Sequence, residues 1–142
     1  MIVLDSSAVV EWLLGLPLAD DVADRIVAAD SLHVPALLDV EVAQVVRRYA
    51  SSGEITAQAG ERALTALADL DAVRYTHELL LPLIWRLRDN LTAYDAAFIA
   101  LAAALDAPLV TLDTRIARAM TPEISGQQIT VDLIAELPAD RP

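Results

Sequence analysis

The chain of 142 residues is long enough to form one domain with its own hydrophobic core. It contains no cysteine, which excludes disulfide frameworks, thiolate zinc sites and cysteine nucleophiles. The formal net charge of −11 argues against charge-driven binding of nucleic acid and favours a metal cation or a basic protein partner. Hydrophobic residues make up 56% of the chain, so we expect a partner to cover part of the apolar surface.

The N-terminal segment lacks the basic start and the cleavage site of a secretory signal. The longest apolar run, Ala96 to Leu105, is far shorter than the roughly 20 residues that a membrane-spanning helix needs. We therefore expect a cytoplasmic protein without a membrane segment.

Short apolar runs alternate along the chain with segments of helical periodicity, which is typical of a parallel sheet flanked by helices. The expected strands are 2–4, 32–34, 72–76, 109–112 and, at the edge of the sheet, 129–133. The expected helices are 6–14, 18–29, 37–49, 56–70, 78–88, 92–105 and 114–120, with Pro82 in a first turn or at a kink. We predict an α/β fold, a three-layer α/β/α sandwich with a mainly parallel central sheet, over residues 1–135. Residues 136–142 are expected to form a polar tail.

Asp5 and Asp113 occupy equivalent places, because each directly follows a short apolar strand and precedes a helix. Ligands of open parallel sheets bind beyond the carboxyl ends of the strands, where two such side chains can meet if their strands are neighbours. The alternative is that each aspartate caps the helix behind it. For either residue alone, both interpretations stay open.

Glu41 and Asp95 lie on the apolar faces of two expected helices. An ionised carboxylate there is costly unless it is paired or bound to a metal. The alternatives for Glu41 are a salt bridge to Arg48 or another arginine, or a helix face that is less buried than it looks. The alternative for Asp95 is a variant of the capping box with Thr92. If all four carboxylates converge, they repel one another and need a cation, and oxygen ligands without histidine or cysteine select Mg²⁺ or Mn²⁺.

The four segments that carry these acids resemble the acidic motifs of PIN-domain nucleases. They read IVLDSSA, LLDVEVAQVVRR, LTAYDAAFIALA and LVTLDTRIA, and their order and spacing match the family over essentially the whole chain. The resemblance is closest to the bacterial VapC-type toxins. It implies a PIN-like fold and a Mg²⁺- or Mn²⁺-dependent endoribonuclease that cleaves RNA by metal-activated water. It also implies two partners, a cognate antitoxin, whose contact surface we expect to be basic, and a second copy of the chain in a homodimer.

The same resemblance assigns roles to the acids. Asp5 and Asp95 would be the principal metal ligands, and Glu41 and Asp113 would complete the site and orient the water. Ser6 and Thr111 are candidate hydroxyl groups that orient these carboxylates, the alternatives being a helix cap and an ordinary strand residue.

One departure concerns the residues after the last motif. Many family members carry a further acid there, but Thr114 and Arg115 follow Asp113. This weakens the case for a second metal ion.

The remaining polar and aromatic residues are interpreted mainly as structural. We expect His33 and His77 to have no catalytic role, and Trp12 and Trp85 to lie in the core or an interface. Arginines at 47, 48, 86, 88 and 115 could hold RNA phosphates or simply face solvent.

Two other classes of function compete with the nuclease. Phosphatases and receiver domains with strand-end aspartates depend on a lysine, and all ten basic residues here are arginine. The alternative that stays open is a PIN-like module without a toxin role, either an RNA-processing nuclease or a non-catalytic protein-interaction domain.

Overall fold

Five strands form a single parallel sheet in the structure, a computed structural model that describes residues 1–119 and 129–135. The strands are β1 (Ile2–Leu4), β2 (Leu32–Pro35), β3 (Ala72–Tyr75), β4 (Leu109–Thr111) and β5 (Val131–Leu133). Their order across the sheet is β3-β2-β1-β4-β5, and every pairing is parallel. The predicted strands are thus confirmed, with β5 at an edge.

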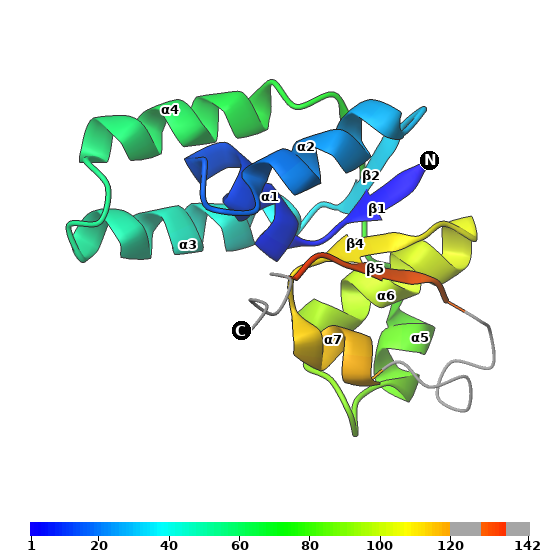
Figure 1. Ribbon diagram of the computed structural model, residues 1–142. Coiled ribbons are helices and arrows are strands. Elements are labelled where there is room, and N and C mark those ends of the chain that lie inside the picture. The colour runs from blue at the N-terminus through cyan, green and yellow to red at the C-terminus, as the bar shows by residue number, and fades with distance from the viewer. Residues whose placement is uncertain (120–128, 136–142) are drawn as a thin grey trace, which may run out of the picture.

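Helices cover both faces of this sheet (Figure 1). One group comprises α1 (Ser6–Leu14), α2 (Ala19–Ala28), α3 (Leu38–Ser51) and α4 (Ala57–Ala68), and the other comprises α5 (Leu81–Arg86), α6 (Ala93–Leu105) and α7 (Thr114–Ala119). Connections toward β3 and connections toward β5 fall on opposite faces because parallel crossovers are right-handed. The three-layer sandwich is confirmed, whereas Met120 and the expected tail at 136–142 lie outside the described residues.

The core is continuous through the three layers and is richest around α6. Residues 96–102 of this helix are all buried, and Phe98 is fully enclosed. A helix that is apolar on nearly every side must be buried on nearly every side, which α6 achieves by packing against α5, β1, β2 and β4. Asp95 lies in the first turn of this buried helix.

The helix predicted over 78–88 is shorter in the structure, where α5 spans Leu81–Arg86. Residues 78–80 form a turn in which the N–H groups of Leu80 and Leu81 both donate to the His77 carbonyl. Pro82 then stands in the first turn, where its missing N–H has no helical partner to lose. The prediction placed Pro82 correctly and the start of the helix wrongly.

The chain changes direction across the sheet between β1 and β4. From β1 it proceeds to β2 and β3, and it then crosses to β4 and β5 on the other side. Ligand sites of open α/β sheets lie at such a switch point, beyond the carboxyl ends of the strands. Asp5 follows β1 and Asp113 lies two residues after β4, so the two acids flank this position. Among the described residues, no helix is long and apolar enough to cross a membrane.

Candidate metal centre

Asp5 is buried directly after β1, with only 3% of its surface exposed. Its Oδ2 atom accepts hydrogen bonds from Ser7 Oγ at 2.6 Å and from Thr111 Oγ1 at 2.8 Å. Its side chain makes no capping bond to α1, so the capping alternative is wrong for this residue. Burial raises the pKa of Asp5; the two hydroxyl groups lower it, and the charge of Asp95 raises it further.

Two hydroxyl groups lock Asp5 to the neighbouring strand. Ser7 Oγ accepts the Leu112 N–H at 3.0 Å, and Thr111 Oγ1 accepts the Asp113 N–H at 3.0 Å. The hydroxyl of Thr111 therefore fixes the orientation of the Asp5 carboxylate, which an ordinary strand residue would not do. Sequence reasoning missed Ser7, although a hydroxyl two residues after a strand-end aspartate was a usable signal.

Glu41 lies in the first turn of α3 and is half-buried. Its Oε2 atom is shielded from solvent and has no hydrogen-bond partner among the described residues. Burial raises the pKa of Glu41; the Ser6 hydroxyl lowers it, and the charges of Asp5 and Asp95 raise it. A salt bridge from Glu41 to Arg48 or to another arginine does not form within the described part of the chain. A shielded carboxylate oxygen without a donor is costly and is a position that a cation could satisfy.

Asp95 lies in the first turn of α6, half-buried, and its charge raises the pKa of both Asp5 and Glu41. Thr92 caps this helix, since its Oγ1 accepts the Asp95 N–H at 3.2 Å. The reciprocal bond, in which the Thr92 N–H would donate to the Asp95 carboxylate, is absent from the described residues. Half of the capping box therefore forms, and the carboxylate of Asp95 is not used in it.

Asp113 has a different environment because Arg115 holds it. The Arg115 N–H donates to Oδ1 at 2.8 Å, as expected for an aspartate that caps a helix, so this alternative is confirmed for Asp113. The guanidinium adds a bond from Nη2 to Oδ2 at 2.6 Å and one from Nε to Oδ1 at 3.1 Å. These contacts lower the pKa of Asp113. Asp95 and Asp5 also help to raise the pKa of Arg115, which places its guanidinium within electrostatic reach of the acidic cluster.

The chemistry of these donors suits Mg²⁺, although the side chains do not form a closed cage. No group of three or more histidine, cysteine, aspartate or glutamate side chains in residues 1–119 and 129–135 is arranged to hold a metal ion. Mg²⁺ usually binds one or two carboxylates and keeps several waters, so it does not require such a cage. Asp5, Glu41 and Asp95 influence one another electrostatically, whereas Asp113 is paired with Arg115.

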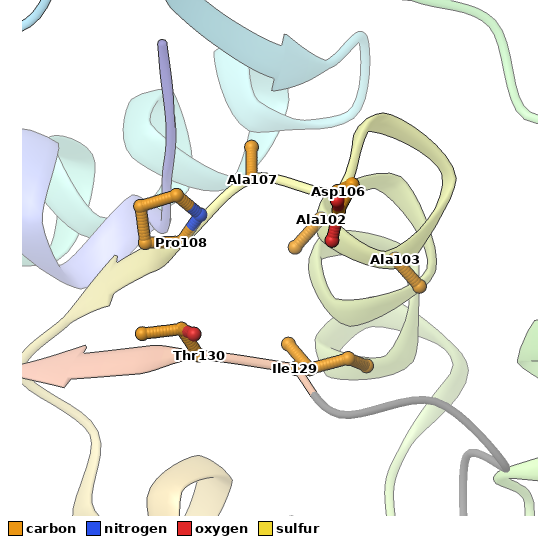
Figure 2. A pocket seen from close by; sticks show the side chains of 7 residues that line it. All are labelled: Ala102, Ala103, Asp106, Ala107, Pro108, Ile129 and Thr130. Carbon is orange, nitrogen blue, oxygen red and sulfur yellow. The ribbon is translucent and has the colours of Figure 1, made fainter.

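A pocket near the N-terminal ends of β4 and β5, at the other end of the strands from Asp5 and Asp113, lacks a cluster of acids. Figure 2 shows this pocket, about 300 Å³ in volume, where α6 ends and β4 and β5 begin. Its lining consists of Ala102, Ala103, Asp106, Ala107, Pro108, Ile129 and Thr130. The exposed Asp106 is the sole acid in this set and no base accompanies it, so the acidic cluster remains the candidate site.

The contacts of the two histidines and of Trp85 are with residues outside the acidic cluster, and Trp12 is partly buried against the core. His33 is buried, and its two ring nitrogens bond Ser31 Oγ at 2.9 Å and Tyr75 Oη at 2.8 Å, which confirms a structural role. His77 Nε2 accepts the Leu37 N–H at 3.3 Å. Trp85 is 68% exposed on α5, so it is not a core residue, and the guanidinium of Arg88 stacks over its ring.

Comparison with known protein families matches the chain to the PIN domain over residues 2–120. The chain belongs to the PIN-domain family. This PIN domain is 44% identical over 116 residues to the VapC ribonuclease Mb0985 of Mycobacterium bovis, covering 82% of the chain and 88% of that protein. It is 42% identical over 118 residues to ribonuclease VapC1 of Mycobacterium tuberculosis, covering 82% and 89%.

Two further comparisons extend over nearly the whole chain. Ribonuclease VapC12 of Mycobacterium tuberculosis is 33% identical over 135 residues, which is 95% of this chain and all of that protein. The fold also matches a chain in the crystal structure of VapBC2 from Rickettsia felis bound to a DNA fragment from their promoter. That match has a TM-score of 0.64 at 12% identity and covers 94% and 98% of the two chains.

Proposed function

We propose that this PIN domain is a Mg²⁺- or Mn²⁺-dependent endoribonuclease that acts as the toxin of a toxin–antitoxin pair. The observation that carries the proposal is the shielded, unpartnered Oε2 of Glu41 beside the buried Asp5 and the carboxylate of Asp95. Such a group of carboxylates is unfavourable in a partly dry site unless a cation is bound. The proteins to which the chain is similar are VapC ribonucleases, which makes an RNA phosphodiester the favoured substrate.

Asp5, Glu41 and Asp95 would hold the ion, with Asp113 joining them when Arg115 releases it. The bound ion would supply positive charge that acidifies a water molecule and offsets charge on the phosphate. Ser7 and Thr111 would keep the Asp5 carboxylate in one orientation through their hydrogen bonds to Oδ2. Glu41 would also help to orient the attacking water.

The decisive experiment is incubation of the purified protein with total cellular RNA and either Mg²⁺, Mn²⁺ or EDTA, followed by mapping of the new 5′ ends. We expect discrete cut sites with either metal and none with EDTA. Cleavage that continues unchanged in excess EDTA would contradict the mechanism. Absence of cleavage with both metals, for protein that melts cooperatively, would contradict the nuclease itself.

The proposed function includes a cognate antitoxin and a second copy of the chain as partners. A net charge of −11 favours an antitoxin with a basic contact surface, and an arginine from it could pair with the carboxylates. Large apolar side chains also remain exposed around α5, with Leu79 93%, Leu81 56% and Trp85 68% exposed. Co-purification from the native host with mass spectrometry should recover a basic partner. Recovery of a free, active homodimer would count against the proposed antitoxin.

A further inference from the structure

A second pocket, about 390 Å³ in volume, opens beside the acidic cluster. It shares Ser6 and Glu41 with that cluster, and Val40, Gln44, Arg48 and Tyr94 form much of the remaining wall. A molecule bound in this pocket would therefore lie next to the carboxylates. The pocket joins the first residues of α1 and α6 to one side of α3.

A stripe of α3 forms the longest wall of this pocket. Glu41, Gln44 and Arg48 are spaced three and four residues apart, so they follow one face of the helix. The rise of an α-helix separates the first from the last by roughly 10 Å. Arg48 is exposed, and no carboxylate of the described residues lies within the 4.0 Å of an ion pair. Its positive charge is therefore available to a ligand.

The other wall carries an aromatic ring that the fold does not bury. Tyr94 is 66% exposed although it is adjacent to Asp95 in the sequence, and Val40, on α3, is 73% exposed. A ring and an aliphatic side chain that remain exposed beside a cation and an amide provide contacts for each part of a nucleotide. An aromatic face stacks on a base, and a guanidinium binds phosphate oxygens.

We propose that this pocket binds the nucleotide that adjoins the scissile phosphate of a single-stranded RNA. Tyr94 stacks on its base, Gln44 hydrogen-bonds the base edge, and Arg48 binds the neighbouring phosphate. The inference rests on the proposed nuclease function and adds the residues that select the cut position. In a chain of net charge −11, a cation beside the acids also provides the local attraction that RNA needs to approach them.

The test uses the full chain and a pool of random single-stranded RNA dodecamers in Mg²⁺, with sequencing of the products. Tyr94→Ala should lower kcat/KM about tenfold or more and flatten the base preference next to the cut, because the stacking contact is lost. Tyr94→Phe keeps the ring and should stay within about twofold of the wild type. Arg48→Ala should weaken binding of all sequences alike and reduce the slope of log affinity against log salt by about 0.7.

Matched controls exist for both substitutions. Arg62→Ala removes an exposed arginine on α4 that does not line this pocket, and Trp85→Ala removes an exposed ring elsewhere. Both should cleave like the wild type. The rise in melting temperature with Mg²⁺ should persist in Tyr94→Ala, which would show that the adjacent Asp95 is undisturbed.

The outcomes separate this proposal from the nuclease proposal. If Tyr94→Ala cleaves with the wild-type rate and base preference, the nucleotide pocket is refuted and the nuclease stands. If instead it loses only antitoxin binding or only dimerisation, the pocket belongs to a protein interface and the proposal is overturned. Binding of a fluorescein-labelled dodecamer pool, followed by anisotropy in the Asp5→Asn background, gives a readout that does not require cleavage. Tyr94-dependent binding together with a wild type that never cleaves would overturn both the nuclease and the proposed place of this pocket beside a scissile phosphate.

Discussion

Burial and mutual repulsion act together on Asp5, and its two hydroxyl donors only partly offset them. Replacement of Asp5 or Asp95 by asparagine removes one negative charge and keeps the shape. We expect Asp5→Asn and Asp95→Asn to abolish RNA cleavage, while the metal-free proteins are as stable as the wild type or more stable. Urea unfolding in EDTA, together with cleavage assays in Mg²⁺, checks both statements. A clear loss of stability in Asp95→Asn would indicate a structural role instead.

Arg115 provides a second prediction at the level of single residues. Its guanidinium donates hydrogen bonds to both carboxylate oxygens of Asp113 and interacts electrostatically with Asp95 and Asp5. It therefore competes with a cation for the negative charge of these carboxylates. Arg115→Ala retains the backbone N–H that caps α7 and should lower the Mg²⁺ concentration at half-saturation about three- to tenfold. Isothermal titration with Mg²⁺ measures this. Arg118→Ala, another exposed arginine on α7, is the control and should bind Mg²⁺ like the wild type.

The site shows which of its details a sequence can predict. Positions at strand ends and on helix faces follow from periodicity, so the places of Asp5, Glu41 and Asp95 were predictable. The pairing of Asp113 with Arg115 was not, because it depends on side-chain rotamers at the start of α7. The sequence also could not decide between core and interface for Trp85, since an apolar side chain does not reveal whether its helix face is covered.

At the level of elements, the N-cap of α6 links stability to the site. Thr92→Ala removes the hydroxyl that accepts the Asp95 N–H, and loss of such a cap costs about 1 kcal/mol. We expect a drop in melting temperature of about 4 °C together with reduced cleavage, because Asp95 lies in the turn that frays. Thr56→Ala is a matched control, since Thr56 Oγ1 caps α4 through the Ala59 N–H at 3.0 Å. It should cost similar stability and leave cleavage unchanged.

The contact between β2 and β3 should make stability depend on pH. Burial lowers the pKa of the His33 imidazole, which bonds Ser31 and Tyr75, and the amino-terminal charge lowers it further. In the unfolded chain the His33 imidazole has a pKa of about 6.5. The contribution of neutral His33 to the stability of the folded protein is therefore complete above that pH. It is lost as the pH falls from 6.5 toward the lower folded-state pKa. Urea unfolding between pH 8 and pH 5 should show that the advantage of wild type over His33→Gln decreases with acidity, and a constant difference would contradict the assignment.

Most elements were predictable because their apolar patterns agree with their positions. The alternating helices and strands require a parallel sheet, and the strand-end acids require β1 and β4 to be neighbours, as they are. The start of α5 was not predictable to within a turn. Pro82 favours a turn at residues 78–80, in which Leu80 and Leu81 donate to the His77 carbonyl, over a helix that begins earlier. The two arrangements differ by only a few hydrogen bonds, so the sequence does not decide between them.

The whole molecule combines an acidic surface with a cluster of partly buried acids. Mg²⁺ can therefore stabilise the fold in two ways, by screening the surface charge and by binding to the cluster, and a test must separate them. A cation that binds only the folded state stabilises it by about 2.7 kcal/mol at 100 times its dissociation constant. For a chain of this length, that stabilisation corresponds to a rise in melting temperature of about 10 °C. Screening of a net charge of −11 depends on ionic strength, whereas specific binding saturates at a defined Mg²⁺ concentration.

We therefore expect Mg²⁺ to raise the melting temperature of the wild type more than NaCl does at equal ionic strength. The double variant Asp5→Asn, Asp95→Asn should respond to the two salts equally, because it retains the acidic surface and loses the two principal ligands. Asp20→Asn, Asp21→Asn removes the same charge from exposed positions on α2 and should keep the wild-type response. Thermal melts of the three proteins in EDTA, MgCl₂ and matched NaCl decide the matter. If the wild type melts identically in MgCl₂ and matched NaCl across the millimolar range, these acids do not form a metal site and the metal-dependent mechanism fails.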